Sequence, residues 1–237
     1  AKGEEPRVSI YNAETGILEQ SFLVYPSVFK GGLSVTVADT NGTGLKEIFV
    51  VPKTGGTPQV LIFNHLGGKL ASFFAGELFG YSDFEIIAGD IPSIPGLAEI
   101  LIIARNSNKA VVYGVDGFVK ENITFGTIFN TATSVQLHGP SETIFFSSGK
   151  GLAPLIQQYY INGLFKKQYF AYGENFKGGV SLGVLDVNGD GSLDVVSGAG
   201  PTGGPHVRVF TEEGVLIGQF FAQSQTYNNG VVIGSKR

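Results

Sequence analysis

Residues 178–221 read GGVSLGVLDVNGDGSLDVVSGAGPTGGPHVRVFTEEGVLIGQFF, and this stretch decides the fold. Residues 31–74 repeat it with substitutions, as GGLSVTVADTNGTGLKEIFVVPKTGGTPQVLIFNHLGGKLASFF. Each copy contains four short runs of β-branched and aromatic residues separated by turn residues, a pattern typical of strands joined by tight turns. A repeat of about 50 residues with four strands has the size and content of one β-propeller blade.

The register of the repeat can be followed along the whole chain. The residues that open the first strand of each copy are Gly32, Asp83, Thr131, Gly179 and Gly230. This predicts four complete blades at 32–82, 83–130, 131–178 and 179–229, a half blade at 1–31 and a closing strand at 230–237. The segment from Pro6 matches the third and fourth strands of a repeat, and the segment from Gly230 matches a first strand.

We therefore predict an all-β fold, a single five-bladed β-propeller domain spanning 1–237. Its closing blade is shared between the termini, with residues 231–235 pairing with residues 7–11. Pairing the two ends would remove open sheet edges, which otherwise invite aggregation.

Composition agrees with many short strands and excludes several other classes. The chain contains 35 Gly and 10 Pro among 237 residues, and no window shows a sustained helical period. A net charge of −4 with 15% charged residues argues against binding to nucleic acid, which needs basic surfaces. The sequence contains no apolar run of about 18 residues, so it does not predict a membrane-spanning helix. Because cysteine is absent, the chain has neither disulfides nor thiol chemistry.

The loop from Asp186 to Asp194 is the strongest candidate site. Side-chain oxygens stand at its first, third, fifth and ninth positions, and the seventh position offers a backbone carbonyl. The predicted ligands are Asp186, Asn188, Asp190, Ser192 and Asp194. Calcium prefers six to eight oxygen ligands, and three carboxylates this close repel one another unless a cation neutralises them. The alternative is an Asp/Asn/Gly turn held by side-chain to backbone hydrogen bonds.

The context of this loop excludes an EF-hand, because position twelve is Ser197 instead of a bidentate Glu and both flanks are predicted strands. The chain resembles the FG-GAP repeats of integrin α-chain propellers and the related VCBS-type repeats of bacterial secreted and surface proteins. The matching residues are Phe176 to Gly179, the Asp186 to Asp194 loop, the turn from Gly198 to Pro201 and the GGPHVRVF run that follows. The resemblance implies a calcium-binding propeller.

The other copies of the loop are less complete. The copy at 39–47 offers Asp39, Asn41, Thr43, Leu45 and Glu47, which predicts a weaker Ca²⁺ site with two carboxylates. In the next copy Asp90 and Glu99 remain, but two prolines stiffen the loop, which is one residue longer. The fourth copy, from His138 to Glu142, has no usable ligand set. We predict no metal in these last two loops.

Aromatic residues recur in the loops that join one blade to the next. The predicted ligand-binding residues are the tyrosines among them, Tyr25, Tyr81, Tyr172 and Tyr227. Such rings either fill the space between blades or form platforms on one face, suited to sugar rings or to a protein partner.

The sequence favours a calcium-stabilised extracellular or cell-surface binding or adhesion module without catalysis. Its three histidines fall at unrelated positions of the repeat, and no nucleophile elbow, zinc helix or phosphate loop is present. The alternatives are a carbohydrate-binding propeller, a lectin in function, and a propeller domain of a polysaccharide-acting enzyme. We expect a protein or glycan ligand on one propeller face, and a monomer or one part of a larger multidomain chain.

Overall fold

The computed structural model describes residues 2–91, 93–94, 98–126, 135–138 and 142–234. In the described part the chain is built of β-strands, with one short 3-10 helix, η1 (Gly76–Leu78). The chain divides into two compact units, residues 1–128 and 129–237, and the division falls close to the predicted blade boundary at residue 130.

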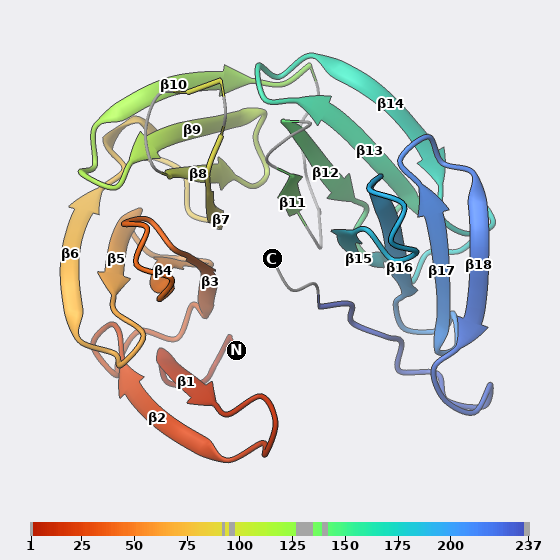
Figure 1. Ribbon diagram of the computed structural model, residues 1–237, viewed down its shortest axis with the longest axis horizontal. Helices are drawn as coiled ribbons and strands as arrows, with labels where there is room; N and C mark the ends of the chain where they lie inside the picture. Colours follow the sequence, from red (N-terminus) through yellow and green to blue (C-terminus); the bar gives the residue numbers. More distant parts are fainter. Residues whose placement is uncertain (1, 92, 95–97, 127–134, 139–141, 235–237) are drawn as a thin grey trace. The chain divides into compact units, whose positions relative to one another are not determined.

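Unit 1 contains a two-stranded sheet and two four-stranded antiparallel sheets (Figure 1). The two-stranded sheet consists of β1 (Arg7–Tyr11) and β2 (Leu18–Leu23). The next sheet consists of β3 (Leu33–Ala38), β4 (Glu47–Pro52), β5 (Gln59–Phe63) and β6 (Lys69–Phe74), paired in that order. The third consists of β7 (Phe84–Gly89), β8 (Glu99–Ala104), β9 (Lys109–Gly114) and β10 (Val119–Thr124), also paired in chain order.

Unit 2 contains two four-stranded antiparallel sheets with the same order of strands. The first consists of β11 (Val135–His138), β12 (Thr143–Ser147), β13 (Leu155–Tyr160) and β14 (Phe165–Phe170). The second consists of β15 (Val180–Leu185), β16 (Asp194–Ala199), β17 (His206–Thr211) and β18 (Leu216–Phe221). All four predicted blades are therefore confirmed, each with four strands.

The position of a strand within its blade explains its composition. The second strands β4 and β8 are buried along their whole length and read EIFVVP and EILIIA. Each has a hydrogen-bonded strand on both sides and packed side chains on both faces, so apolar residues suit every position. The fourth strands β6 and β18 are almost entirely exposed, and only their hydrogen-bonded edge is covered by a neighbour.

Within each unit, neighbouring sheets pack face to face through apolar side chains. In unit 1 a core joins the blades β3–β6 and β7–β10 through residues such as Phe49, Phe84 and Ile100. A smaller cluster, including Val24 and Phe63, joins β1–β2 to the first of these blades. In unit 2 a third core joins β11–β14 to β15–β18. Sheets of four strands stacked on one another in chain order are consecutive blades of a β-propeller.

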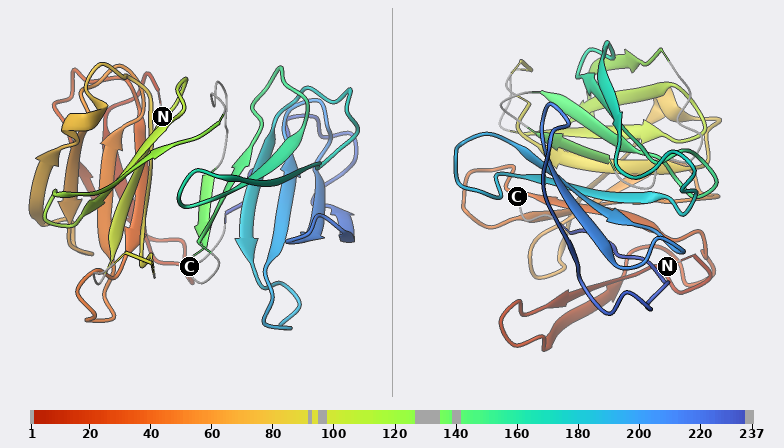
Figure 2. Two further views of the ribbon diagram at one scale, coloured as in Figure 1. Left: turned by 90° about the horizontal axis from the view of Figure 1, so that it is seen from above. Right: turned by 90° about the vertical axis from the view of Figure 1, so that its right-hand side faces the viewer.

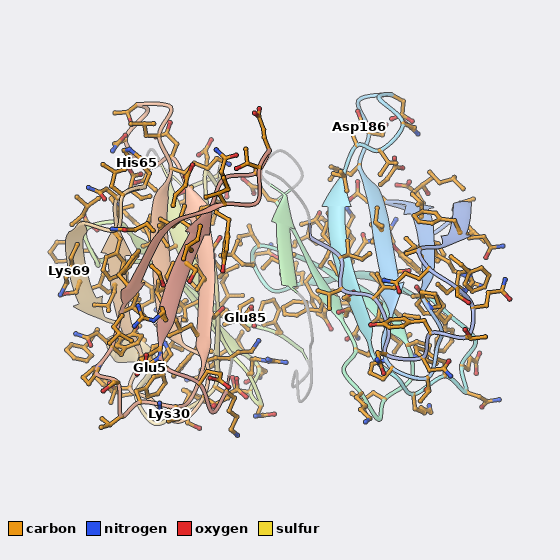
Figure 3. All side chains as sticks on the ribbon, turned by 90° about the horizontal axis from the view of Figure 1, so that it is seen from below. Glu5, Lys30, His65, Lys69, Glu85 and Asp186 are labelled. Atoms are coloured by element: carbon orange, nitrogen blue, oxygen red, sulfur yellow. The ribbon has the colours of Figure 1, made fainter. Side chains whose placement is uncertain are left out.

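Antiparallel connections place the loops of each blade at its two ends (Figure 2). Loops between the first and second strands share one end with the turns between the third and fourth. The loops that enter each blade lie at the other end. In unit 1, His65 in the β5–β6 turn and Lys30 before β3 lie at opposite ends (Figure 3).

The closing blade differs from the prediction, and four complete blades are formed instead of five. In the described part of the chain, β1 pairs with β2 alone and residues 230–234 form no strand. These last residues bind the blade before them: the Val231 N–H donates to the carbonyl of Ala199 at 2.8 Å, and the Ile233 N–H donates to Ser181 Oγ at 3.1 Å. Ser181 Oγ also donates to the Val231 carbonyl at 2.8 Å.

These contacts match those that a first strand makes in unit 1. There the Ile86 N–H of β7 donates to Ser34 Oγ of β3, also at 3.1 Å. Residues 231–233 therefore occupy the place of a first strand against β15–β16, as the repeat predicts. No ladder is formed by these residues in the described part of the chain.

Candidate functional site

The loop after β15 folds around the side chain of Asp186, which Figure 3 shows beyond the ends of the strands. Asp186 Oδ1 accepts the N–H groups of Gly189 at 2.6 Å and Asp190 at 3.2 Å, and its Oδ2 accepts that of Gly191 at 2.9 Å. Asn188 Oδ1 accepts the same Asp190 N–H at 2.9 Å. Because two side chains accept one N–H, their oxygens converge inside the loop.

Asp190 adds a second carboxylate to this loop. Its Oδ1 accepts the Ser192 N–H at 2.7 Å and its Oδ2 accepts the Asn188 side-chain amide at 2.9 Å. The Ser192 N–H is the main cause that lowers the pKa of Asp190, and the Asn188 amide adds to it. Donors that favour the ionised form keep this exposed carboxylate charged at neutral pH.

Asp194 plays a different part from the other two carboxylates. It is buried as the first residue of β16, and its Oδ2 accepts the Val187 N–H at 3.0 Å. Nowhere in the described chain do three or more His, Cys, Asp or Glu side chains come together as a metal would require. The structure thus brings Asp186, Asn188 and Asp190 together and uses Asp194 as the anchor of the loop. Calcium binding stays a prediction.

The copy at residues 39–47 has nearly the same hydrogen bonds. Asp39 accepts N–H groups from Gly42 at 2.8 Å, Thr43 at 3.2 Å and Gly44 at 2.7 Å, and Asn41 Oδ1 also accepts the Thr43 N–H. These donors, led by Gly44, lower the pKa of Asp39. Leu45, the predicted carbonyl ligand, is exposed.

Glu47 differs from Asp194 because both of its oxygens have donors. Oε2 accepts the N–H and the hydroxyl of Thr40, each at 2.8 Å, and Oε1 accepts the Asn41 side-chain amide at 2.8 Å. Asn41 is therefore bonded to the anchor, whereas Asn188 is bonded to another residue of the loop, Asp190.

A buried acid at the start of the second strand is common to three of the four blades. Glu47, Glu99 and Asp194 each accept a backbone N–H from the preceding loop; the donor to Glu99 is Ile91, at 2.9 Å. This acid holds the loop even in the copy at 90–99, which lacks the other calcium ligands. The fourth copy lies largely outside the described residues. The sequence assigned Glu47 and Asp194 to a metal and Glu99 to none. The structure shows that all three acids accept an N–H of the preceding loop, and metal binding at Glu47 and Asp194 stays a prediction.

Two of the four predicted ligand-binding tyrosines hold blades together. The Tyr172 hydroxyl is buried and lies within 3.0 Å of the carbonyl oxygens of Ser197 and His206. The Tyr25 hydroxyl lies 2.5 Å from the carbonyl oxygen of Gln59 in the next blade. Desolvation raises the pKa of both hydroxyls. We do not retain these two tyrosines as ligand contacts.

The other two tyrosines have different surroundings. Tyr81 is half-buried and packs against the core of unit 1. Tyr227, 37% exposed, is the most accessible of the four predicted residues. Tyr227 stands at the repeat position of Phe176, whose ring packs at an inter-blade position against the core of unit 2.

Phenylalanines at that inter-blade position pack between glycines. A Cβ atom on Gly178 would lie 2.4 Å from the Phe176 ring and 2.1 Å from the Pro201 carbonyl oxygen. In unit 1 a Cβ atom on Gly31 would meet Phe29 and Thr54 in the same way. The recurrent Phe-Lys-Gly-Gly segment therefore allows close packing of loop against blade. Among the aromatics at this position, Phe79 is exposed.

A cavity beside Glu99 has no counterpart in the sequence analysis. It measures about 200 Å³ and is lined by Thr40, by Ala98 and Glu99 at the start of β8, by Gly114 at the end of β9, by Asp116 in the following turn and by Lys120 in β10. No motif indicates it, because its residues come from three separate loops of unit 1.

Comparisons with known proteins show the fold and leave the ligand open. No protein-family model and no curated protein matches the chain. A chain in the structure of streptogramin B lyase is 14% identical, with a TM-score of 0.59, and the match covers 95% of this chain and 65% of that one. A chain in the crystal structure of BBS1N in complex with ARL6DN is 13% identical, with a TM-score of 0.58, over 93% of this chain and 63% of that one.

A third similar structure is that of the Dos1 propeller, at 12% identity and a TM-score of 0.50, over 92% of this chain and 54% of that one. The chain spans less than two-thirds of each of these three chains. At such identities the likeness shows a β-propeller fold alone. Across the described residues, no helix has the length and apolar character needed to span a membrane.

Proposed function

We propose that the chain is a non-catalytic propeller that binds a protein or glycan at the cell surface or outside the cell, stabilised by Ca²⁺ in the loop from Asp186 to Asp194. One observation carries the calcium part: side-chain oxygens of Asp186, Asn188 and Asp190 all accept hydrogen bonds within a single exposed loop. Oxygen donors of this kind suit a hard cation of flexible geometry. Bound Ca²⁺ would supply positive charge between the two exposed carboxylates.

The same observation limits which residues would hold the ion. Asp186, Asn188 and Asp190 are the side-chain ligands that the geometry supports, and the carbonyl of Ser192 follows them in the loop. Asp194 already accepts the Val187 N–H, so it would hold the loop in place and offer its other oxygen. At residues 39–47, Thr43 replaces the second carboxylate of the loop, so we propose weaker binding there.

The count of repeats includes two partial repeats near the ends of the chain, although the structure forms four complete blades. In this count β1–β2 correspond to the third and fourth strands of a further blade, and residues 230–234 correspond to its first strand. The contacts of Val231 and Ile233 with β15–β16 support the second correspondence.

Thermal unfolding with and without calcium tests the proposed ion. A site that binds the folded chain alone adds about 2.7 kcal/mol at a Ca²⁺ concentration a hundred times the dissociation constant. We expect excess Ca²⁺ to raise the Tm of the wild-type protein relative to excess chelator. Asp186→Asn and Asp190→Asn should remove this difference, whatever they do to the Tm in chelator.

Glu174→Gln is the matched control, since Glu174 is an exposed acid in another loop of the same unit. Its Ca²⁺-dependent rise in Tm should equal that of the wild type. If the wild-type Tm is the same in Ca²⁺ and in chelator, the loop is a turn closed by its own hydrogen bonds and calcium is not its ligand.

A carbohydrate ligand is the second candidate, and the cavity beside Glu99 favours it. The cavity joins carboxylate and ammonium groups with the apolar side chains of Ala98 and Val115, a mixture that suits sugar hydroxyls and ring faces. A role as a propeller domain of a polysaccharide-acting enzyme is consistent with the same cavity, although no side-chain arrangement described above specifies a reaction.

A further inference from the structure

Glu99 has one carboxylate oxygen without a partner. The side chain is 1% exposed, and Oε2 accepts the Ile91 N–H at 2.9 Å. Oε1 is buried, and no described residue hydrogen-bonds to it. At the same position of the preceding blade, both oxygens of Glu47 have donors. The unmade bond therefore distinguishes the blade β7–β10 from the blade β3–β6.

The unpaired oxygen belongs to a residue that lines the cavity of about 200 Å³. Leaving a buried acceptor unpaired is destabilising, and more so when the group is charged. Burial is the largest cause that raises the pKa of Glu99, and the charge of Asp90 adds to it, whereas the Ile91 N–H and Lys120 oppose the rise. A ligand that supplies a hydrogen-bond donor would remove this cost.

The part of the cavity lining that comes from β9, β10 and the turn between them carries one acid and one base. A Cβ atom on Gly114 would lie 2.5 Å from Asp116 Oδ1 and 3.0 Å from Lys120 Cε. The absence of a side chain at Gly114 lets both residues lie over the end of β9, next to the cavity. The cavity thus presents acceptors on Glu99 and Asp116, a donor on Lys120, and the Thr40 hydroxyl, whose proton is directed to Glu47.

This mixture of charges selects among classes of ligand. A cation would be attracted by the carboxylates and repelled by Lys120. An anion would be attracted by Lys120 and repelled by the carboxylates. Neutral hydroxyl groups can donate to a carboxylate and accept from an ammonium at the same time. The volume exceeds what a single water needs, so more than one polar group can enter.

We propose that this cavity binds one residue of a carbohydrate, with a ring hydroxyl donating to Glu99 Oε1 and a neighbouring hydroxyl accepting from Lys120. The inference rests on the proposed binding function and names a glycan as the ligand class. Ala98 and Val115 provide the apolar wall against which the C–H groups of a pyranose ring pack.

Saturation-transfer NMR and calorimetric titration of the whole chain would test this site. The probes are the methyl pyranosides of glucose, galactose, mannose and N-acetylglucosamine, with methylammonium and acetate as charged probes. We expect at least one glycoside to bind more tightly than either charged probe. Glu99→Gln preserves the size of the side chain and should weaken that glycoside about tenfold, the effect of a hydrogen bond to a charged group.

Lys120→Met provides a second variant, because Lys120 is exposed and its loss leaves the Glu99 anchor intact. It should also weaken the glycoside, even if Glu99→Gln fails to fold. Lys69→Met is the matched control, since it removes an exposed lysine of the same unit that does not line the cavity. It should leave the affinity for the glycoside unchanged.

Three results would overturn the inference: no glycoside binds and the cavity holds water only, a charged probe binds more tightly, or Lys120→Met binds the glycoside as the wild type does. Repeating the titration in excess chelator separates this site from the calcium proposal. If a glycoside binds and Ca²⁺ has no effect on Tm, the calcium proposal is wrong and the glycan site stands. If Ca²⁺ raises the Tm and no glycoside binds, the glycan site alone is wrong.

Discussion

Thr202 adopts a backbone conformation that glycine adopts at the same position of other repeats. Its φ is +76°, and the corresponding Gly3, Gly55 and Gly151 have φ of +94°, +69° and +94°. Each donates its N–H to a carbonyl of the loop that enters the next blade; for Thr202 the acceptor is Asn228, at 2.9 Å. A β-branched residue in this region is strained.

We expect Thr202→Gly to raise the free energy of unfolding. Relief of strain outweighs the extra flexibility of glycine in the unfolded chain, for a net gain of roughly 0.5–1 kcal/mol. Thermal or urea unfolding would measure it. Thr226→Gly, at an exposed threonine without positive φ, should give no gain, and an equal gain in both variants would show that the strain at Thr202 is not the cause.

Gly178→Ala should have the opposite effect, because its Cβ would collide with the Phe176 ring and the Pro201 carbonyl. Backbone at the point of collision leaves little room for relaxation, so a loss of about 1–3 kcal/mol is expected. Gly173→Ala adds a methyl group where no atom lies within 4 Å and serves as the control. Equal urea midpoints for the two variants would contradict the packing described for Phe176.

At the scale of the element, strands were predictable and the roles of loop residues were not. Runs such as EILIIA and turn residues at fixed spacing placed every blade, because burial on both faces demands apolar side chains. The same spacing did not separate the anchoring role of Asp194 from a ligand role, since both need an acid at that position. The repeat spacing also could not show whether Tyr172 contacts a ligand or forms hydrogen bonds to the neighbouring blade.

The segment at 231–233 forms no strand but is held against the blade β15–β18 by hydrogen bonds. Ser181→Ala removes both hydrogen bonds of the serine to this segment, at Val231 and Ile233, and should lower the free energy of unfolding by about 1–2 kcal/mol. Hydrogen exchange followed by mass spectrometry should show faster exchange at 231–234 in this variant. Ser27→Ala, on an exposed loop of unit 1, is the control; unchanged exchange in both would mean that the segment is not held by Ser181.

At the scale of the whole molecule, the repeat predicted four blades correctly and the fifth incorrectly. Complete blades supply their own second and third strands, so their pairing follows from local sequence. The pieces assigned to the fifth blade lie far apart in the chain, so their pairing does not follow from local sequence. The cavity beside Glu99 was also unpredictable, because three loops distant in sequence form it.

The tyrosine ties between blades make the protein sensitive to alkali. Desolvation raises the pKa of the Tyr172 hydroxyl from 10.0 to about 12, and that of Tyr25 moves in the same direction. The neutral form is favoured by the fold, so this stabilisation is complete below pH 10 and is lost as the pH rises through about 12.

The chain has nine tyrosines and no tryptophan, so near-ultraviolet absorbance reports phenolate formation directly. Exposed tyrosines should ionise reversibly first, and the buried ones should ionise together with unfolding, as a steep late step. In Tyr172→Phe that step should lose amplitude; a smooth titration of all nine near pH 10 would show that the hydroxyls are free in solution.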